Sequence, residues 1–146
     1  MLLNLIRLPL ENVKNCRDLG GYPTPQGTTK WRSFLRSGDL GRMNDHEGRL
    51  LHEFGVRSVI DLRSPEECEL SPNPLADDPR FRYQLVDLIP RPNDGETFMT
   101  RDLSKITLGD LYVAILEHKP QIRRVFTQIA DAPTGAVLFH CTAGKD

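Results

Sequence analysis

Apolar side chains recur at helical spacing in three parts of the chain. In the first part, Asn44 and Glu47 have the spacing of a capping box, and Gly55 supplies a natural stop. A second amphipathic helix is expected to open at Thr107. A third begins near Pro120, because proline is best tolerated in the first turn of a helix. We expect the apolar faces of the two later helices to lie in the core.

Runs of apolar and β-branched residues predict strands between these helices. The clearest run covers residues 56–62 and follows the first helix. Shorter runs predict strands at 5–8, 31–35, 81–88 and 136–139. Residues rich in Gly and Pro are expected to form loops at 15–27 and 71–80, and the irregular segment 90–106 a mobile flap. The alternation of helices and strands predicts an α/β fold in a single domain, residues 1–146.

Composition narrows the possible classes of function. The chain carries 19 basic and 20 acidic residues, so with a net charge of −1 no global field would attract nucleic acid or an anionic membrane. No stretch approaches the roughly 20 apolar residues of a membrane span, and the start of the chain lacks the pattern of a signal peptide. We therefore expect a cytoplasmic protein without stable membrane insertion.

Three cysteines are spread widely along the chain. Their odd number and wide spacing argue against a disulfide framework and against a zinc site, which favours a reducing compartment. Cys16 and Cys68 are interpreted as small buried hydrophobic residues. The histidines on the expected helices, His46, His52 and His118, are interpreted as surface or core-edge residues. Neither a metal nor a cofactor is expected.

The third cysteine stands in a different setting. The apolar run 136–139 leads directly into His140 and Cys141, and a Gly-containing segment follows; we call residues 141–146 the cysteine loop. Backbone N–H groups of such a loop hold a phosphate, and the N-terminus of a following helix adds positive potential. The same field stabilises a thiolate. Cys141 is therefore predicted to be a nucleophile beside an anion-binding loop.

The neighbours of this cysteine have complementary predicted roles. Thr142 and Ala143 supply backbone donors, and Gly144 permits a backbone conformation that is closed to other residues. Lys145 adds a cation that attracts an anionic substrate. His140 is predicted to position the loop through its ring nitrogens. These residues together form the predicted substrate-binding part of the site.

The run His-Cys-Thr-Ala-Gly-Lys-Asp at 140–146 resembles the start of the HCxAGKDR signature of bacterial tyrosine and dual-specificity phosphatases. Three upstream segments resemble the same family in the expected order: Asn-Cys-Arg-Asp-Leu-Gly-Gly at 15–21, Arg-Ser-Gly-Asp-Leu at 36–40 and Asp-Leu-Arg-Ser-Pro-Glu-Glu at 61–67. The resemblance implies a central, mostly parallel sheet flanked by helices, as in protein tyrosine phosphatases. It also implies metal-free hydrolysis of phosphotyrosine, and in some members of phosphoserine, phosphothreonine or phosphoinositides, through a cysteinyl-phosphate intermediate.

In that family the cysteine loop continues to an arginine, which would be residue 147, and then into a helix. Arginine binds two phosphate oxygens at once and stabilises charge in the transition state. The resemblance therefore implies that residues 1–146 alone, without this arginine and the C-terminal helices, have little activity. The expected partners are a phosphorylated protein or a phosphoinositide as substrate, and a complementing C-terminal segment.

The general acid has two possible locations. Members with the Gly-Lys-Asp form place an aspartate inside the loop, which corresponds to Asp146, and we favour this residue as the group that protonates the departing oxygen. Many tyrosine phosphatases carry the acid on a separate upstream loop, where Asp87, Asp94 and Asp102 are candidates.

Charged residues in the matched segments also have two interpretations. The pairs Arg17–Asp18 and Arg36–Asp39 are either structural ion pairs or part of the rim of the site. Arg63, at the end of a predicted strand, is equally undecided.

Two other classes of function compete with phosphatase activity. A non-catalytic phosphate-binding module would have phosphate affinity without forming a phosphorylated intermediate. Sulfur transfer and arsenate reduction also use a cysteine in an anion-binding loop. The Gly-Lys-Asp ending and the upstream segments weigh against sulfur transfer, and the distance of the other cysteines along the sequence weighs against arsenate reduction.

Overall fold

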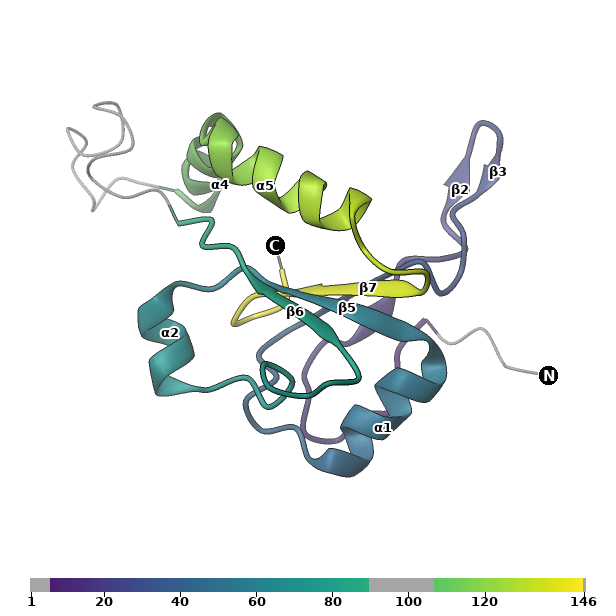
Figure 1. The fold of residues 1–146 in the computed structure, drawn as a ribbon. Coiled ribbons are helices and arrows are strands. Elements are labelled where there is room, and N and C mark those ends of the chain that lie inside the picture. Colours follow the sequence, from purple (N-terminus) through teal and green to yellow (C-terminus); the bar gives the residue numbers. More distant parts are fainter. Residues whose placement is uncertain (1–5, 90–106, 146) are drawn as a thin grey trace.

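A five-stranded sheet with helices on both faces forms the centre of the molecule. The computed structural model describes residues 6–89 and 107–145. The elements follow in the order β1 (Arg17–Asp18), β2 (Pro23–Thr24), β3 (Gly27–Thr28), β4 (Phe34–Ser37), α1 (Asp45–Phe54), β5 (Val56–Asp61), α2 (Pro65–Leu70), β6 (Arg82–Leu85), α4 (Leu108–Glu117), α5 (Lys119–Ala130) and β7 (Ala136–His140). Helices α1 and α2 lie on one face of the sheet, and α4 and α5 lie on the other (Figure 1). The predicted α/β class is confirmed.

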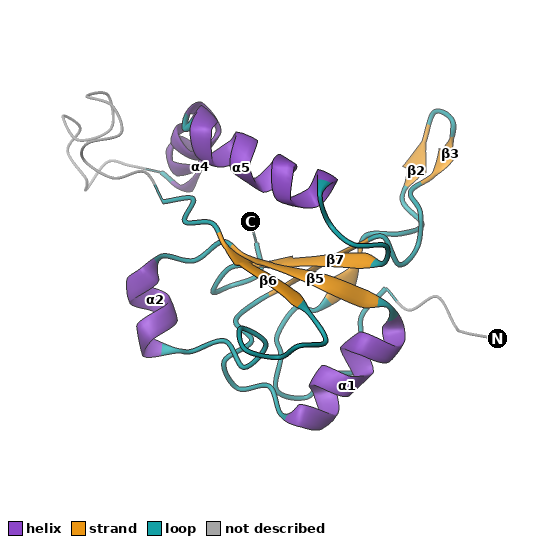
Figure 2. Ribbon diagram, viewed as in Figure 1, coloured by secondary structure: helices purple, strands orange, loops and turns teal. Residues whose placement is uncertain are grey.

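The sheet is mostly parallel, as predicted. Its strands lie in the order β1-β4-β7-β5-β6, in which β1 is antiparallel to β4 and the other neighbours are parallel, whereas β2 and β3 form a separate hairpin (Figure 2). Strand β7 is therefore central, between β4 and β5. Parallel strands end at the same edge of a sheet. Their last residues Ser37, His140 and Asp61 accordingly lie side by side in register.

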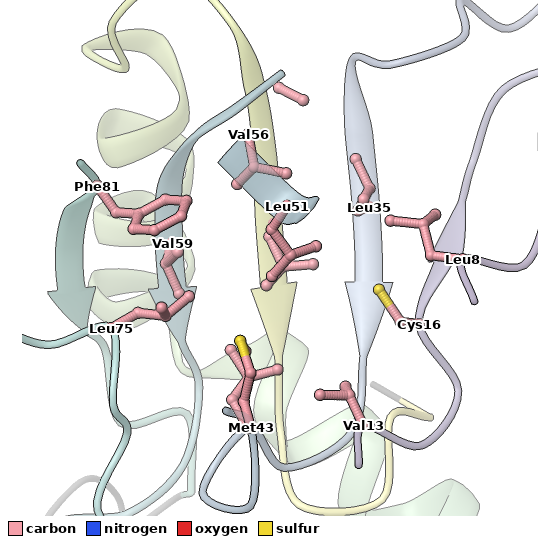
Figure 3. Packing of buried hydrophobic residues seen from close by; sticks show 13 residues of the cluster. Leu8, Val13, Cys16, Leu35, Met43, Leu51, Val56, Val59, Leu75 and Phe81 are labelled. Carbon is pink, nitrogen blue, oxygen red and sulfur yellow. The ribbon is translucent and has the colours of Figure 1, made fainter. Parts of the chain in front are cut away.

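The core lies in two layers because the central strands are buried on both faces. The cluster around Leu51 of α1 comprises Leu8, Val13, Cys16, Leu35, Leu40, Met43, Leu51, Val56, Val59, Leu75, Phe81, Ala136 and Leu138 (Figure 3). On the other face, Val125 and Ile129 of α5 pack against Ile60, Leu62, Val86 and Val137. Side chains alternate along a strand. His140, two residues after Leu138, and Asp61, two residues after Val59, therefore belong to the face that α1 covers.

Helix α1 forms where its local signals predict it. The Asn44 side chain accepts a hydrogen bond from the Glu47 N–H, and the Glu47 side chain accepts one from the Asn44 N–H, which completes the capping box. Gly55 ends the helix with a φ of 116°, a value that favours glycine. Strand β5 begins at the next residue, so the connection between helix and strand is as short as the sequence indicated.

Several shorter elements differ from the sequence-based expectations. Strand β4 covers Phe34–Ser37 and not 31–35, because its pairing with β7 starts at Phe34. The expected loop 15–27 contains β1 and β2, which are two-residue pairings too short to give a periodic signal. Residues 81–88 contribute only Arg82–Leu85 as a strand. The expected strand at 5–8 is reduced to a bridge between Arg7 and Arg17 within its described part.

Helix α2 was not predicted at all. It covers Pro65–Leu70, directly after β5. Ser64 and Glu67 form a capping box, and Pro65 occupies the first turn, where proline is favoured. This Ser-Pro-x-Glu pattern was the local signal that would have located the helix.

The two later helices form where predicted, but the expectation that their apolar faces lie fully in the core is wrong. No described residue of α4 or α5 is fully buried. Leu108 and Leu116 of α4 are 57% and 67% exposed, and Phe126 of α5 is 65% exposed. The physical reason is that α5 meets the sheet along one side only, through Val125 and Ile129, while α4 packs beside α5.

Two further expectations concern the segment 90–106 and membrane-spanning helices. The expected flap at 90–106 lies outside the described residues. Among the helices in 6–89 and 107–145, none has the length and apolarity needed to cross a membrane.

Candidate active site

Cys141 lies at the carboxyl edge of the sheet, directly after the central strand β7. The backbone N–H of Leu62 donates to the carbonyl of His140 at 2.8 Å, which continues the pairing of β5 and β7 to the end of the strand. Cys141 itself is buried, and its Sγ accepts a hydrogen bond from the Gly144 N–H at 3.1 Å. The cysteine loop therefore turns back over the sulfur within three residues and places a backbone donor on it.

The carbonyl groups of the cysteine loop are bound by the surrounding fold. Three successive oxygens accept hydrogen bonds: Thr142 from the Asp39 N–H at 3.0 Å, Ala143 from Asn15 Nδ2 at 2.9 Å, and Gly144 from Arg36 Nε at 3.0 Å and from Arg36 Nη2. The donors come from the loop before β1, from β4 and from the residues after β4. Three separate parts of the chain thus hold one side of the loop.

This arrangement turns the loop amides away from the bound carbonyls, and the Gly144 amide points at the sulfur. In a trans peptide the C=O of one residue and the N–H of the next point in opposite directions. Because the carbonyls of 142–144 point outward, the N–H groups of Ala143, Gly144 and Lys145 point the other way, and the bond from the Gly144 N–H to the sulfur shows this direction. Convergent backbone N–H groups form an anion-binding concavity.

Gly144 is required by both conformation and space. Its φ is +75°, in the region that side chains disfavour. A Cβ atom at this position would lie 2.6 Å from the Gly38 backbone nitrogen and 2.8 Å from the Ser37 carbonyl carbon. The loop therefore passes closer to the end of β4 than any other residue type would permit, as the sequence predicted for this glycine.

The side chain of Thr142 has a partner that the sequence did not reveal. Thr142 Oγ1 donates to Glu67 Oε1 at 2.5 Å. The second oxygen of Glu67 accepts from the Ser64 N–H at 2.9 Å as part of the α2 cap. The contact joins α2 to the loop across 75 positions, so local pattern could locate the helix but not the hydrogen bond.

Both ring nitrogens of His140 have a polar neighbour. Nδ1 lies 3.1 Å from the carbonyl oxygen of Cys141, and Nε2 lies 2.9 Å from Asn73 Nδ2. Asn73 belongs to the loop between α2 and β6, which no sequence motif marked. The ring is fully buried, so these contacts fix its orientation next to Cys141.

Below the ring lies a buried ion pair formed by Asp61 and Arg63. Arg63 donates from Nε and Nη2 to the two oxygens of Asp61 at 2.9 Å and 2.8 Å, and from Nη1 to Asp39 Oδ1 at 3.1 Å and the Ser71 carbonyl at 2.8 Å. Burial opposes ionisation of Asp61, but the neighbouring His140 ring and then the Arg63 guanidinium hold the pKa of its carboxyl well below the usual range. Arg63 is therefore structural, which resolves its two interpretations.

The other charged pairs of the sequence do not form as pairs. Asp18 is buried and accepts from the Gly20 and Arg32 N–H groups, both at 2.8 Å, which makes it structural. Arg17 donates to Asn15 Oδ1 at 3.2 Å, and so supports the side chain that binds the Ala143 carbonyl. Likewise Arg36 binds the cysteine loop, whereas Asp39 bridges Arg63 and Ser71.

The general acid is not located by the described residues. Asp94, Asp102 and the favoured Asp146 lie outside them. Asp87 lies just beyond β6 at the carboxyl edge of the sheet, and its Oδ1 accepts from the Ile89 N–H at 2.9 Å. Lys145, the predicted cation of the loop, is exposed.

The remaining cysteines lie apart from this chemistry. All three cysteines are free thiols. Burial, with a smaller contribution from Asp18, raises the pKa of the Cys16 thiol to about 12. Burial also raises the pKa of Cys68, whose Sγ lies 3.7 Å from Asp61 Oδ2. Among the described residues, no three His, Cys, Asp or Glu side chains come together as a metal site would require.

Known proteins are similar to this chain over most of its length. The model of the tyrosine phosphatase family matches residues 8–146. A tyrosine-protein phosphatase of Nostoc commune is 45% identical over 121 residues, which cover 78% of this chain and 39% of the relative. A protein of Cupriavidus necator that is provisionally named a tyrosine-protein phosphatase is 30% identical over 146 residues, which cover 95% of this chain and 52% of the relative. The chain thus spans about half or less of the length of these relatives, and it belongs to the tyrosine phosphatase family.

Proposed function

We propose that this chain carries the active site of a phosphomonoester hydrolase that acts on phosphotyrosine through a cysteinyl-phosphate intermediate. Family membership supports the phosphatase chemistry. The observation that carries the proposal is the hydrogen bond from the Gly144 N–H to Cys141 Sγ, in a loop whose carbonyls at 142–144 are bound by the surrounding fold. A buried sulfur beneath convergent amides suits a nucleophile that attacks a bound dianion.

The reaction proposed for this site has two displacements. The phosphate of the substrate binds to the N–H groups of Ala143, Gly144 and Lys145, and the Lys145 ammonium adds attraction. The Cys141 thiolate then attacks phosphorus, the sulfur–phosphorus bond forms, and the bond to the tyrosine oxygen breaks with its electron pair on oxygen. A general acid gives that oxygen a proton. Water then attacks phosphorus and gives a proton to the deprotonated general acid, while the sulfur–phosphorus bond breaks with its electron pair on sulfur, which releases inorganic phosphate and restores the thiolate.

The acid in this scheme is proposed to be Asp146. The proposal rests on the resemblance of the loop to the Gly-Lys-Asp form of the family, with Asp87, Asp94 and Asp102 as the alternatives. Replacing the true acid with asparagine should slow the first step most for substrates with poor leaving groups. An unchanged rate for every substrate in Asp146→Asn would assign the role to another residue.

Phosphotyrosine in proteins is the proposed substrate, and phosphoserine, phosphothreonine and phosphoinositides are further candidates within the same chemistry. The exposed Lys145 is compatible with a highly charged inositol headgroup. A panel of phosphopeptides and phosphoinositide vesicles, compared by kcat/KM, would rank them. We also propose a reducing, cytoplasmic setting, which three free thiols support.

The decisive experiment is to trap the intermediate in the full-length chain, by which we mean a chain that continues beyond residue 146 through the loop arginine and the next helix. Acid-quenched reactions with a phosphotyrosine peptide should show a phosphoryl group on Cys141 by peptide mass spectrometry. Cys141→Ser should abolish the adduct and turnover, whereas Cys68→Ser is the matched control and should keep both. Phosphate binding without any adduct or turnover would instead indicate a non-catalytic phosphate-binding module.

A second proposal concerns residues 1–146 as a separate polypeptide. The resemblance places the loop arginine at position 147, so the 146-residue polypeptide should turn over slowly. Adding the following segment in trans as a complementing peptide should raise its activity. Equal kcat/KM for the 146-residue polypeptide and for a chain that continues through the arginine and the next helix would refute this proposal.

A further inference from the structure

The amide of Asn73 has a single possible orientation. Its Oδ1 accepts a hydrogen bond from the Leu75 backbone N–H at 2.9 Å, and a backbone N–H can only donate. Its Nδ2 lies 3.4 Å from Asp61 Oδ2, and a carboxylate can only accept. Both contacts place the NH₂ group on the side of His140. Asn73 is 7% exposed, so its side chain lies largely out of contact with solvent.

This orientation determines where the proton of His140 is. Nδ1 lies 3.1 Å from the Cys141 carbonyl oxygen, which can only accept, so Nδ1 carries a hydrogen. Nε2 lies 2.9 Å from Asn73 Nδ2, which can only donate, so Nε2 accepts and carries none. The imidazole is then neutral, in the tautomer with its hydrogen on Nδ1.

A charged ring is the competing state, because Asp61 Oδ2 lies 3.3 Å from Nε2 and could take a hydrogen bond from an imidazolium. That state would set two donors, Nε2–H and the Asn73 NH₂ group, against each other at the shorter distance of 2.9 Å. Asp61 also has other donors, since both its oxygens accept from Arg63 and Oδ2 accepts from the Tyr83 hydroxyl at 2.9 Å. The neutral ring therefore keeps the shorter of the two contacts of Nε2, at 2.9 Å with Asn73, and the charged ring would keep the longer one, at 3.3 Å with Asp61.

Charged and titratable groups from several elements lie against this ring or against the ion pair that it contacts. They are Asp61 of β5, Arg63 after β5, Cys68 of α2, Tyr83 of β6, Asp39 after β4 and Cys141 in the loop. Arg63 pairs with both Asp61 and Asp39, so these three groups together carry a net charge of −1, which by itself favours a charged ring. The neutral ring therefore depends on Asn73, whose NH₂ group offers Nε2 a donor at 2.9 Å.

We propose that Asn73 is a positioning residue that keeps His140 neutral, so that the ring orients the Cys141 peptide without placing a positive charge beside the nucleophile. This inference rests on the proposed role of Cys141 as the attacking thiolate. A thiolate that is stabilised by the neutral Gly144 N–H retains more basicity than one beside an imidazolium, and nucleophilicity rises with basicity.

The tautomer can be measured directly in the full-length chain. Ring ¹⁵N chemical shifts of His140 at neutral pH should show a protonated Nδ1 and an unprotonated Nε2. In Asn73→Asp, one carboxylate oxygen can still accept from the Leu75 N–H, while the other faces Nε2 and requires a hydrogen there. The ring should then become an imidazolium at the same pH.

The nucleophile should respond to this change. Alkylation of Cys141 by iodoacetamide follows the thiolate, and its pH midpoint in Asn73→Asp should move down by about one unit, since an opposite charge nearby favours the ionised form. The new carboxylate is itself part of an ion pair and offsets some of this effect. The fully ionised cysteine should react about threefold more slowly, as a less basic thiolate does.

Asn44→Asp is the matched control for these measurements. It makes the same chemical change in the α1 cap, where Asp serves as well as Asn, so the His140 signals and the Cys141 midpoint should not move. A wild-type spectrum with Nε2 protonated would overturn the proposal. The wild-type spectrum decides even if the variant does not fold. Absent phosphatase activity together with the expected tautomer would reject the proposed function and leave the Asn73 assignment standing.

Discussion

Arg36 offers the most direct test of how the fold holds the cysteine loop. Its guanidinium donates from both Nε and Nη2 to the Gly144 carbonyl, and the same peptide unit carries the Lys145 N–H that would face the phosphate. Replacing Arg36 with Met keeps a flexible apolar stem of similar reach but removes both hydrogen bonds and the charge. The Gly144–Lys145 peptide would then be free to rotate.

The expected loss follows from the strength of these bonds. A hydrogen bond that involves a charged group contributes about 1.5–3 kcal/mol. This contribution stabilises the conformation in which the loop amides converge. Losing it should weaken binding of the phosphate, and of the transition state, by the same free energy. At 1.4 kcal/mol for each factor of ten, kcat/KM should fall by about 10- to 150-fold in Arg36→Met.

The assay compares four proteins in the full-length chain. Steady-state kcat/KM for a phosphotyrosine peptide and the inhibition constant of inorganic phosphate are measured for the wild type, Arg36→Met, Arg36→Lys and Arg57→Met. Arg57 is the matched control, because its guanidinium also binds backbone carbonyls, those of His52 at 2.7 Å and Val56 at 2.8 Å, but at the opposite end of the sheet. Arg57→Met should lower the melting temperature without changing the inhibition constant.

Arg36→Lys separates charge from geometry. Lysine keeps the positive charge but cannot donate two bonds from a planar fork. We expect it to recover part of the loss, with activity between those of the wild type and Arg36→Met. Wild-type kinetics in a folded Arg36→Met, or an equal loss in Arg57→Met, would refute the idea that Arg36 holds the loop for phosphate binding.

Three further predictions concern the same region. Gly144→Ala should reduce kcat/KM at least tenfold because of its positive φ and the nearby Gly38 nitrogen, whereas Gly109→Ala in α4 should stabilise the fold by about 0.5–1 kcal/mol; normal activity in Gly144→Ala would contradict this. The lowered pKa of Asp61 means that its carboxylate stabilises the fold above the unfolded-state pKa of about 3.9, and that this contribution is lost as pH falls below it. Asp61→Asn should therefore lower the melting temperature at neutral pH, with the difference shrinking below about pH 4; a constant difference would count against it. Because burial raises the pKa of Cys16 to about 12, iodoacetamide should not label this cysteine in the native protein. Labelling of Cys16 in the native protein would show that the core around it opens.

The elements with complete local signals were the ones that the sequence predicted well. The α1 helix has a capping box at its start and a glycine at its end, and β5 is a continuous apolar run, so both formed where expected. The start of β4 was displaced because it depends on register with β7, a strand about a hundred positions later. Whether a helix face is buried also depends on distant packing, which is why Leu116 and Phe126 were wrongly placed in the core.

The candidate site likewise combines residues that a local sequence signal identifies with residues that only distant contacts bring in. The residues that carry the proposed chemistry, from His140 to Lys145, are contiguous, and a local motif could identify them; their roles stay predictions. Glu67 and Asn73 could not be found in this way, because nothing near either residue indicates that it reaches the end of β7. Only the order of strands in the sheet brings the ends of β4, β5 and β7 to one edge.

The geometry of the cysteine loop is consequently a property of the fold and not of the signature alone. The signature supplies the sulfur, the amides and the glycine, but the side chains that turn its carbonyls outward come from Asn15 and Arg36, which are 128 and 108 positions away from their acceptors. Both lie in the upstream segments that resemble the family, Asn15 in Asn-Cys-Arg-Asp and Arg36 in Arg-Ser-Gly-Asp. These segments can therefore be understood physically. They bind the carbonyls of the cysteine loop from outside, and a chain with the cysteine motif but without them would present the same residues with the amides free to point elsewhere.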